Sequence, residues 1–202
     1  MNLICESNSL DDYLVETEDV NHSHYLIKNK AKELYSQSLD EIGFIKSAFE
    51  FVRDFIPHSW DIQSSRITCS ASEVLFYQEG ICYAKSNLLC ALLRCQGIPT
   101  GFCYQRLTLG DTPDTGYVIH ALNAVYLRSI GKWIRLDARG NKAGVDAQFS
   151  LEEEKLAFPI REVYEEQDYP VIYKTPNKKT TAVLLQNTDC KMMYLHGLPS
   201  EL

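Results

Sequence analysis

Apolar residues at three- and four-residue spacing predict a buried helix near the middle of the chain. The apolar stripe of this helix consists of Leu88, Leu89, Ala91, Leu92 and Leu93. Gly97 ends the helix and Pro99 reinforces the stop, since neither residue favours helix continuation. Residues 98–105 then read as a strand. We therefore expect Cys82, which follows a turn at Gly80, to lie at or near the N-terminus of a core helix.

The segment before this helix is also helical in pattern. Residues 29–37 predict one helix, and residues 41–54 predict a second that ends before Pro57. The second helix has an apolar face made of Ile42, Ile45, Ala48, Phe49, Val52 and Phe55. A short helix over 73–76 follows, capped by Ser70 or Ser72, and a short strand is predicted at 13–15.

A hairpin follows the central helix. Alternating residues from His120 to Leu127 suit a strand, a turn covers 129–131, and a second strand over 132–136 ends at Asp137. Because antiparallel pairing joins the start of one strand to the end of the next, His120 and Asp137 should lie side by side.

The expected fold is α+β, with a helical N-terminal half and the Cys82 helix packed on an antiparallel sheet. Residues 1–28 form an acidic N-terminal extension, residues 29–142 the core, and residues 143–202 a C-terminal segment packed on the same domain. Within that last segment we predict an edge strand at 169–173 and one helix over 180–193.

Composition narrows the class of protein. The 202 residues are 45% hydrophobic and 23% charged, as in a globular protein, and the net charge is −7. This charge argues against nucleic acids and anionic membranes as partners. The first residues lack the pattern of a signal peptide, and no long apolar run occurs, so we expect a cytoplasmic protein. Seven cysteines without a C-x-x-C pair predict reduced thiols, no metal site and no cofactor.

Three residues have the order required for nucleophilic catalysis. A helix N-terminus favours a thiolate at Cys82 through its partial positive charge and its free N–H groups. His120 would act as the base, and Asp137 would orient the imidazole and stabilise its cation. Taken singly, each residue suits a structural role, but together they predict a Cys-His-Asp triad.

The sequence around these three residues resembles that of the transglutaminase-like superfamily. Gly-Ile-Cys followed by ALLRCQGIP is similar to its cysteine motif, HALNAVYL to its histidine motif, and KWIRLDARGN to its aspartate motif. The resemblance covers roughly residues 40–142. It implies a papain-like core with Cys82 as nucleophile, His120 as base and Asp137 as the orienting acid. Many relatives carry an acidic residue soon after the cysteine, where this chain has Tyr83-Ala84-Lys85.

Five more residues are candidates for binding substrate or the oxyanion. Gln78 lies four residues before Cys82, where an amide N–H could join the Cys82 N–H in an oxyanion hole. Trp60 could form a wall of the acyl pocket, beside the loop imidazole of His58. The others are Tyr83, Asn123 and Arg139, which follows Asp137 closely enough to pair with its carboxylate.

The function predicted from these observations is that of a cysteine-dependent amide hydrolase or acyltransferase that forms a thioester intermediate. Its substrate would be a peptide, a protein or a small amide. Two alternatives remain open at this point. One is an arylamine-type N-acyltransferase with the same triad, and the other is a non-catalytic binding or scaffold module that keeps the fold. The bacterial-type relatives that the resemblance implies are often proteases.

Overall fold

The computed structural model describes all residues, Met1–Leu202. The α-helices are α1 (Tyr25–Ser36), α2 (Glu41–Phe55), α3 (Ala71–Tyr77), α4 (Cys82–Cys95), α5 (Lys178–Gln186) and α6 (Cys190–His196). The strands are β1 (Ile4–Cys5), β2 (Thr100–Thr108), β3 (Tyr117–Leu127), β4 (Lys132–Leu136), β5 (Gln167–Asp168) and β6 (Val171–Ile172). The fold is α+β, as the sequence predicted.

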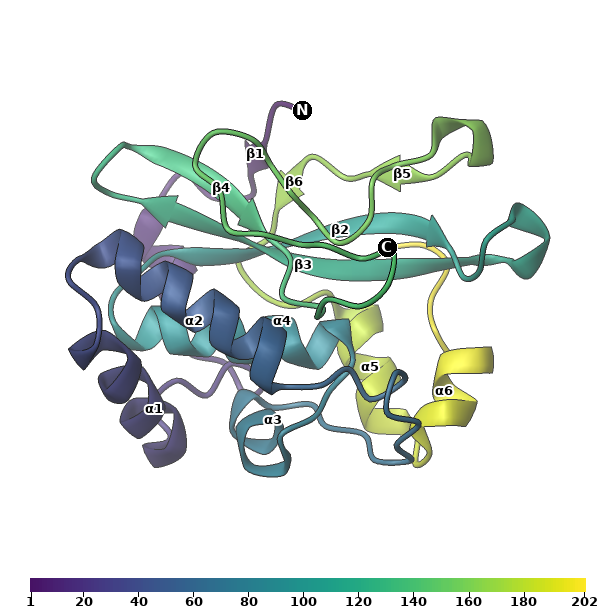
Figure 1. Ribbon diagram of the computed structural model, residues 1–202, viewed down its shortest axis with the longest axis horizontal. Helices are drawn as coiled ribbons and strands as arrows, with labels where there is room; N and C mark the ends of the chain where they lie inside the picture. Colours follow the sequence, from purple (N-terminus) through teal and green to yellow (C-terminus); the bar gives the residue numbers. More distant parts are fainter.

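A four-stranded antiparallel sheet of order β4-β3-β2-β5 separates two layers. The helices cover its lower face in Figure 1, while β1, β6 and the long segment after β4 cover the upper one. The larger core cluster lies between sheet and helices, and a smaller one lies on the opposite face, made of Tyr13, Cys103, Leu122, Ala124 and Ile172.

Helix α4 is the centre of the larger core. Its residues are buried without interruption from Tyr83 to Arg94, because α1, α2 and α3 cover one side and β2 and β3 the other. Burying a leucine side chain stabilises a fold by roughly 1.5–3 kcal/mol, so the four leucines of α4 contribute strongly to holding the layers together. The chain thereby places Cys82, the first residue of α4, at the end of a helix that cannot shift independently.

Local sequence signals such as helix caps and turns correctly predicted where several helices and strands begin or end. Helix α2 begins at Glu41 after an N-cap at Asp40, whose carboxylate accepts the Gly43 N–H at 2.7 Å. Ser70 is the cap of α3 and forms a capping box with Glu73, as its spacing suggested. The hairpin turn and β4 also lie where predicted, whereas β3 starts earlier, at Tyr117.

Two predictions near the chain ends were wrong. Residues 180–193 form two helices, because Asp189 caps a new helix by accepting the Met192 N–H at 3.0 Å. Residues 10–13 form a 3₁₀ helix that ends where a strand was expected. The predicted edge strand at 169–173 is present as β6, and its parallel partner β1 is a strand that the sequence did not reveal. This parallel pairing joins residues far apart in the sequence, so local sequence patterns could not predict it.

Glycine is required where the small β1–β6 sheet meets β2. Tyr173, just after β6, exchanges backbone hydrogen bonds of 2.8 Å with Phe102. A Cβ added at the neighbouring Gly101 would lie 2.5 Å from Cγ2 of Ile172 and 2.8 Å from the Tyr173 carbonyl oxygen. The close approach therefore excludes any larger side chain and fixes the C-terminal segment on the core.

No helix in the structure has the length and apolar character needed to cross a membrane.

Replacing Gly101 by alanine should lower the free energy of unfolding by about 1–3 kcal/mol, since the added methyl overpacks the junction of β2 with β6. Urea denaturation of both proteins measures the change. Thr112→Ala, at an exposed position where the hydroxyl does not cap the adjacent 3₁₀ helix, is the control and should change stability by less than about 0.5 kcal/mol. Equal effects of both substitutions would contradict the packing argument.

Candidate active site

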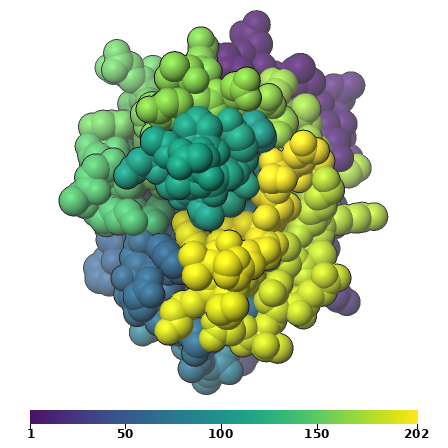
Figure 2. Space-filling model, turned by 90° about the vertical axis from the view of Figure 1, so that its right-hand side faces the viewer, coloured from purple at the N-terminus to yellow at the C-terminus, as the bar shows by residue number.

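A cleft of about 550 Å³ opens at the N-terminal end of α4. Segments distant in sequence meet around it, as the space-filling view of this side of the molecule shows (Figure 2). They are the loop at His58 and Trp60, the start of α4, the β2–β3 connection, the loop after β4, residues 157–161 and the end of α6. Both Cys82 and His120 line the cleft.

Cys82 occupies the first position of α4 and is partly exposed. The N-cap residue is Ile81, and no side chain caps the helix. The N–H groups of the first turn are consequently not consumed by a capping oxygen, and they remain available to an anion or a polarised carbonyl. The local sequence accounts for this arrangement, since Gly80 and Ile81 offer no capping oxygen.

His120 and Asp137 are in direct contact. Nε2 of His120 lies 2.8 Å from Oδ2 of Asp137, and both side chains are almost fully buried. Strand β3 supplies the histidine, and the residue after β4 supplies the aspartate, so the predicted hairpin brings them together. The imidazole nitrogen left free by this contact is Nδ1.

Two backbone N–H groups hold the Asp137 carboxylate. Arg139 N–H donates to Oδ1 and Ala157 N–H donates to Oδ2, each at 3.1 Å. Burial raises the pKa of Asp137, but the charge of His120 and these hydrogen bonds outweigh it, so the pKa lies below its ordinary value. Asp137 is therefore a carboxylate at neutral pH.

The neighbours of His120 favour its cation. Burial by itself lowers the pKa of His120, but the charges of Asp137 and Cys82 and the side-chain hydrogen bonds with both outweigh it. The pKa rises to about 10 from the ordinary 6.5. At neutral pH the imidazole is therefore protonated and paired with the Asp137 carboxylate, and Cys82 lines the same cleft.

A buried lysine lies one turn beyond Cys82 on α4. The Lys85 ammonium donates hydrogen bonds to the carbonyls of Arg53 and Ile56, at the C-terminal end of α2. A cation there complements the negative end of the helix. Burial lowers the pKa of Lys85 to about 7. Lys85 is not part of the cleft wall, so it ties α4 to α2 instead of meeting a substrate.

Arg139 forms an ion pair with a carboxylate, as its position suggested, but its guanidinium pairs with Asp61 and not with Asp137. Its guanidinium donates to both carboxylate oxygens of Asp61, at 2.5 and 2.9 Å, and Lys142 donates to the same carboxylate at 2.8 Å. Burial raises the pKa of Asp61, yet its hydrogen bonds with both cations lower it to about 2. The pair joins the Trp60 loop to the turn after Asp137.

Aromatic rings border the site. The Trp60 ring stacks on Tyr194 of α6, with centroids 4.3 Å apart and planes 13° apart. On the other side, the Phe158 ring meets His120 edge to face at 5.2 Å. These rings give the cleft apolar walls, and Trp60 is one of the residues that line it.

Three of the proposed binding residues lie outside the cleft wall. Gln78 is exposed, in the left-handed conformation that ends α3, so it is not placed as an oxyanion donor. Tyr83 is buried and donates its hydroxyl to the Ile119 carbonyl at 2.6 Å. Asn123 donates to the Ser86 and Gly101 carbonyls, each at 3.2 Å, and so braces α4 against the sheet.

Sequence reasoning missed Tyr194, Phe158 and the carboxylate of Asp61. Tyr194 and Phe158 come from the C-terminal segment, where no motif marks them. Asp61 adjoins Trp60, but nothing in the sequence indicates its pairing with Arg139. These contacts depend on which loops meet over the cleft, which local sequence does not determine.

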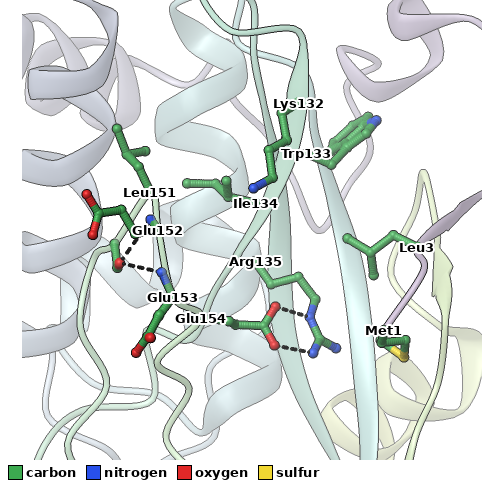
Figure 3. Close-up of a pocket in the computed structure, with 11 residues that line it drawn as sticks. Met1, Leu3, Lys132, Trp133, Ile134, Arg135, Leu151, Glu152, Glu153 and Glu154 are labelled. Atoms are coloured by element: carbon green, nitrogen blue, oxygen red, sulfur yellow. Dashed lines mark hydrogen bonds and ion pairs between the residues drawn. The ribbon is translucent and has the colours of Figure 1, made fainter.

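A second pocket, of about 240 Å³, lies beside β4 and the N-terminal residues (Figure 3). Arg135 pairs there with Glu154, at 2.5 Å, and the same guanidinium also pairs with Asp168. Its lining contains neither a cysteine nor a histidine, unlike that of the cleft at α4. No group of three or more His, Cys, Asp or Glu side chains is arranged to hold a metal ion.

A search of solved structures finds proteins with a similar fold. A candidate cysteine protease from Cytophaga hutchinsonii matches 66% of this chain with 17% identity and a TM-score of 0.53. This chain covers 43% of that protein, so it spans less than half its length. At this identity the likeness shows the fold alone.

Two further matches are weaker. A structure described as a TGase matches with 17% identity and a TM-score of 0.46, covering 88% of this chain and 51% of that one. The periplasmic domain of TgpA from Pseudomonas aeruginosa matches with 14% identity and a TM-score of 0.46, covering 62% and 45% of the two chains. A comparison with curated proteins finds no match.

The family comparison rests on sequence and shows which family the chain belongs to. The model of the transglutaminase-like superfamily matches residues 28–138, which is more than half of the chain and includes Cys82, His120 and Asp137. The matched range also begins and ends close to the core that we expected between residues 29 and 142. The chain therefore belongs to the transglutaminase-like superfamily.

Proposed function

We propose that this protein is a cysteine-dependent amide hydrolase or acyltransferase that works through a thioester on Cys82. The observation that supports this most directly is the 2.8 Å contact of His120 with Asp137, in the cleft that Cys82 opens into. A nucleophile, a base and an orienting carboxylate are the minimum set for acyl transfer through a thiol.

His120 acts as the base in this proposal. Its cation is stabilised by Asp137, and it takes the thiol proton of Cys82. The thiolate attacks the substrate carbonyl carbon and the S–C bond forms. His120 then gives its proton to the leaving amine as the C–N bond breaks, and a thioester remains.

The acceptor decides between hydrolysis and transfer. In hydrolysis, neutral His120 removes a proton from water as the water oxygen attacks the thioester carbonyl. The C–S bond then breaks and releases the acid and the Cys82 thiolate. An amine in place of water gives a new amide. We favour water, and a peptide, protein or small amide as substrate, since the similarly folded Cytophaga hutchinsonii protein is described as a candidate cysteine protease.

Cys82 should react selectively with iodoacetamide at about pH 6. Burial raises the pKa of five other thiols, which are Cys69, Cys90, Cys95, Cys103 and Cys190. The partly exposed Cys5 is the internal reference. We expect alkylation of Cys82 at least about tenfold faster than that of Cys5, because a neighbouring imidazolium favours the thiolate. Mass spectrometry locates the modified residue.

His120→Ala should remove the advantage of Cys82 over Cys5. If Cys82 and Cys5 are alkylated at equal rates in the unaltered protein, and His120→Ala changes neither rate, the result would favour a non-catalytic module that keeps the fold.

Stability should depend on pH through His120. The folded pKa, about 10, exceeds the ordinary 6.5, so protonated His120 stabilises the fold fully below about pH 6.5, and this contribution is lost as the pH rises to about 10. The stability advantage over His120→Gln should therefore shrink from pH 6.5 to pH 10 in urea denaturation. Cys82→Ala removes one anion next to His120, so the decline in stability should move to lower pH. If the stability advantage over His120→Gln instead grew with pH, the assignment of the raised pKa to His120 would be contradicted.

Asp137→Asn should keep the packing but remove the charge that orients His120. Incubation with p-nitrophenyl acetate should transfer an acetyl group to Cys82, detected as a mass gain on its peptide. We expect the substitution to slow this acylation by about 10²- to 10⁴-fold, as losing the orienting carboxylate does in related triads. Cys82→Ala provides the background rate, and acylation that survives in that variant would refute a thioester on Cys82.

A further inference from the structure

Nucleophilic attack by Cys82 requires hydrogen-bond donors for the oxygen of the substrate carbonyl. The N–H groups at the start of α4 provide one side of such a site. A second donor should come from a side chain next to them, and Gln78 does not fill this role because it is exposed at the end of α3.

His58 is fixed beside the start of α4 by the backbone. Residues His58 and Gly80 form an isolated parallel bridge, in which Ser59 N–H donates to the Gly80 carbonyl at 3.2 Å and Gly80 N–H donates to the Pro57 carbonyl at 3.4 Å. Gly80 precedes Cys82 by two residues. The imidazole therefore borders the cleft next to the approach to the nucleophile, and it lines the same cleft as Cys82 and His120.

The His58 ring has an unused polar atom. The side chain is only 4% exposed, and its Nδ1 is buried without a hydrogen-bond partner. An unpaired buried polar atom costs stability, on the order of 1–3 kcal/mol, so its retention in a catalytic cleft suggests a ligand that pairs with the ring. The ring meets Tyr194 edge to face at 6.0 Å, which holds its orientation.

His58 is also suited to donate as a neutral group. Burial lowers the pKa of His58 well below its ordinary value, and the nearby charge of Arg139 lowers it further. A neutral imidazole has one N–H donor and no proton to lose in the working pH range, so it can stabilise an oxyanion without competing with His120 for the proton.

Two other polar side chains near the site are already engaged. Asn123 donates its amide to two backbone carbonyls. Lys85 donates to the carbonyls at the end of α2. Among the side chains that line the cleft, His58 is the one with a buried polar atom that has no hydrogen-bond partner.

We propose that His58 is a catalytic residue that donates an imidazole N–H to the oxyanion, opposite the N–H groups at the start of α4. This inference rests on the proposed thioester chemistry. With p-nitrophenyl acetate, the S–C bond forms and the carbonyl π electrons move onto oxygen. The oxyanion then collapses, the C–O bond breaks, and p-nitrophenolate leaves with the electron pair.

Two reagents separate this role from a structural one. Acylation by p-nitrophenyl acetate passes through an oxyanion, whereas alkylation by iodoacetamide displaces iodide and forms none. In His58→Phe, which keeps an aromatic ring but has no N–H, acylation of Cys82 should fall about 10²-fold relative to alkylation. In His58→Gln, whose amide can donate, at least tenfold of that loss should return.

His22→Phe, in the N-terminal segment outside the cleft, is the matched control and should leave the ratio of the two rates unchanged. If His58→Phe lowers both rates equally, or lowers neither, the oxyanion role is overturned while the triad stands. If the unaltered protein is alkylated at Cys82 but never acylated there, the thioester mechanism fails, and the role of His58 fails with it.

Discussion

The Asp137 carboxylate lies where water cannot reach it, and three hydrogen-bond donors hold it there. A buried charge is tolerated only when it is paired and fully hydrogen-bonded. His120 supplies the pair at 2.8 Å, and the backbone N–H groups of Arg139 and Ala157 supply the rest. The hairpin, the turn after β4 and the segment at Ala157 must therefore all be in place before the site can hold this charge.

This constraint links the C-terminal segment to the catalytic core. Ala157 binds Asp137 and Phe158 covers His120, while Tyr194 of α6 stacks on Trp60. Residues beyond the range matched by the family model thus complete the cleft of the proposed enzyme. The core and the C-terminal segment are separate ranges of the sequence, but both supply residues to the site.

Electrostatics assigns separate tasks to the two imidazoles of the cleft. The Asp137 carboxylate favours the cation of His120, whereas burial lowers the pKa of His58 and favours its neutral form. In the proposed mechanism the cation serves the sulfur and the neutral imidazole donates to the carbonyl oxygen. The Arg139–Asp61 ion pair joins the Trp60 loop to the turn after Asp137.

The sequence by itself determined the nucleophile helix, the hairpin and hence the Cys82, His120 and Asp137 set, because helix stripes, caps and strand pairing act over short distances. Spacing alone could not show that Gln78 ends its helix facing solvent or that Tyr83 and Asn123 brace the core. It also did not reveal that Tyr194, Phe158 and Asp61 reach the cleft. Those positions depend on the packing of segments distant in sequence, and that packing exists only once the sheet and helices have closed on each other.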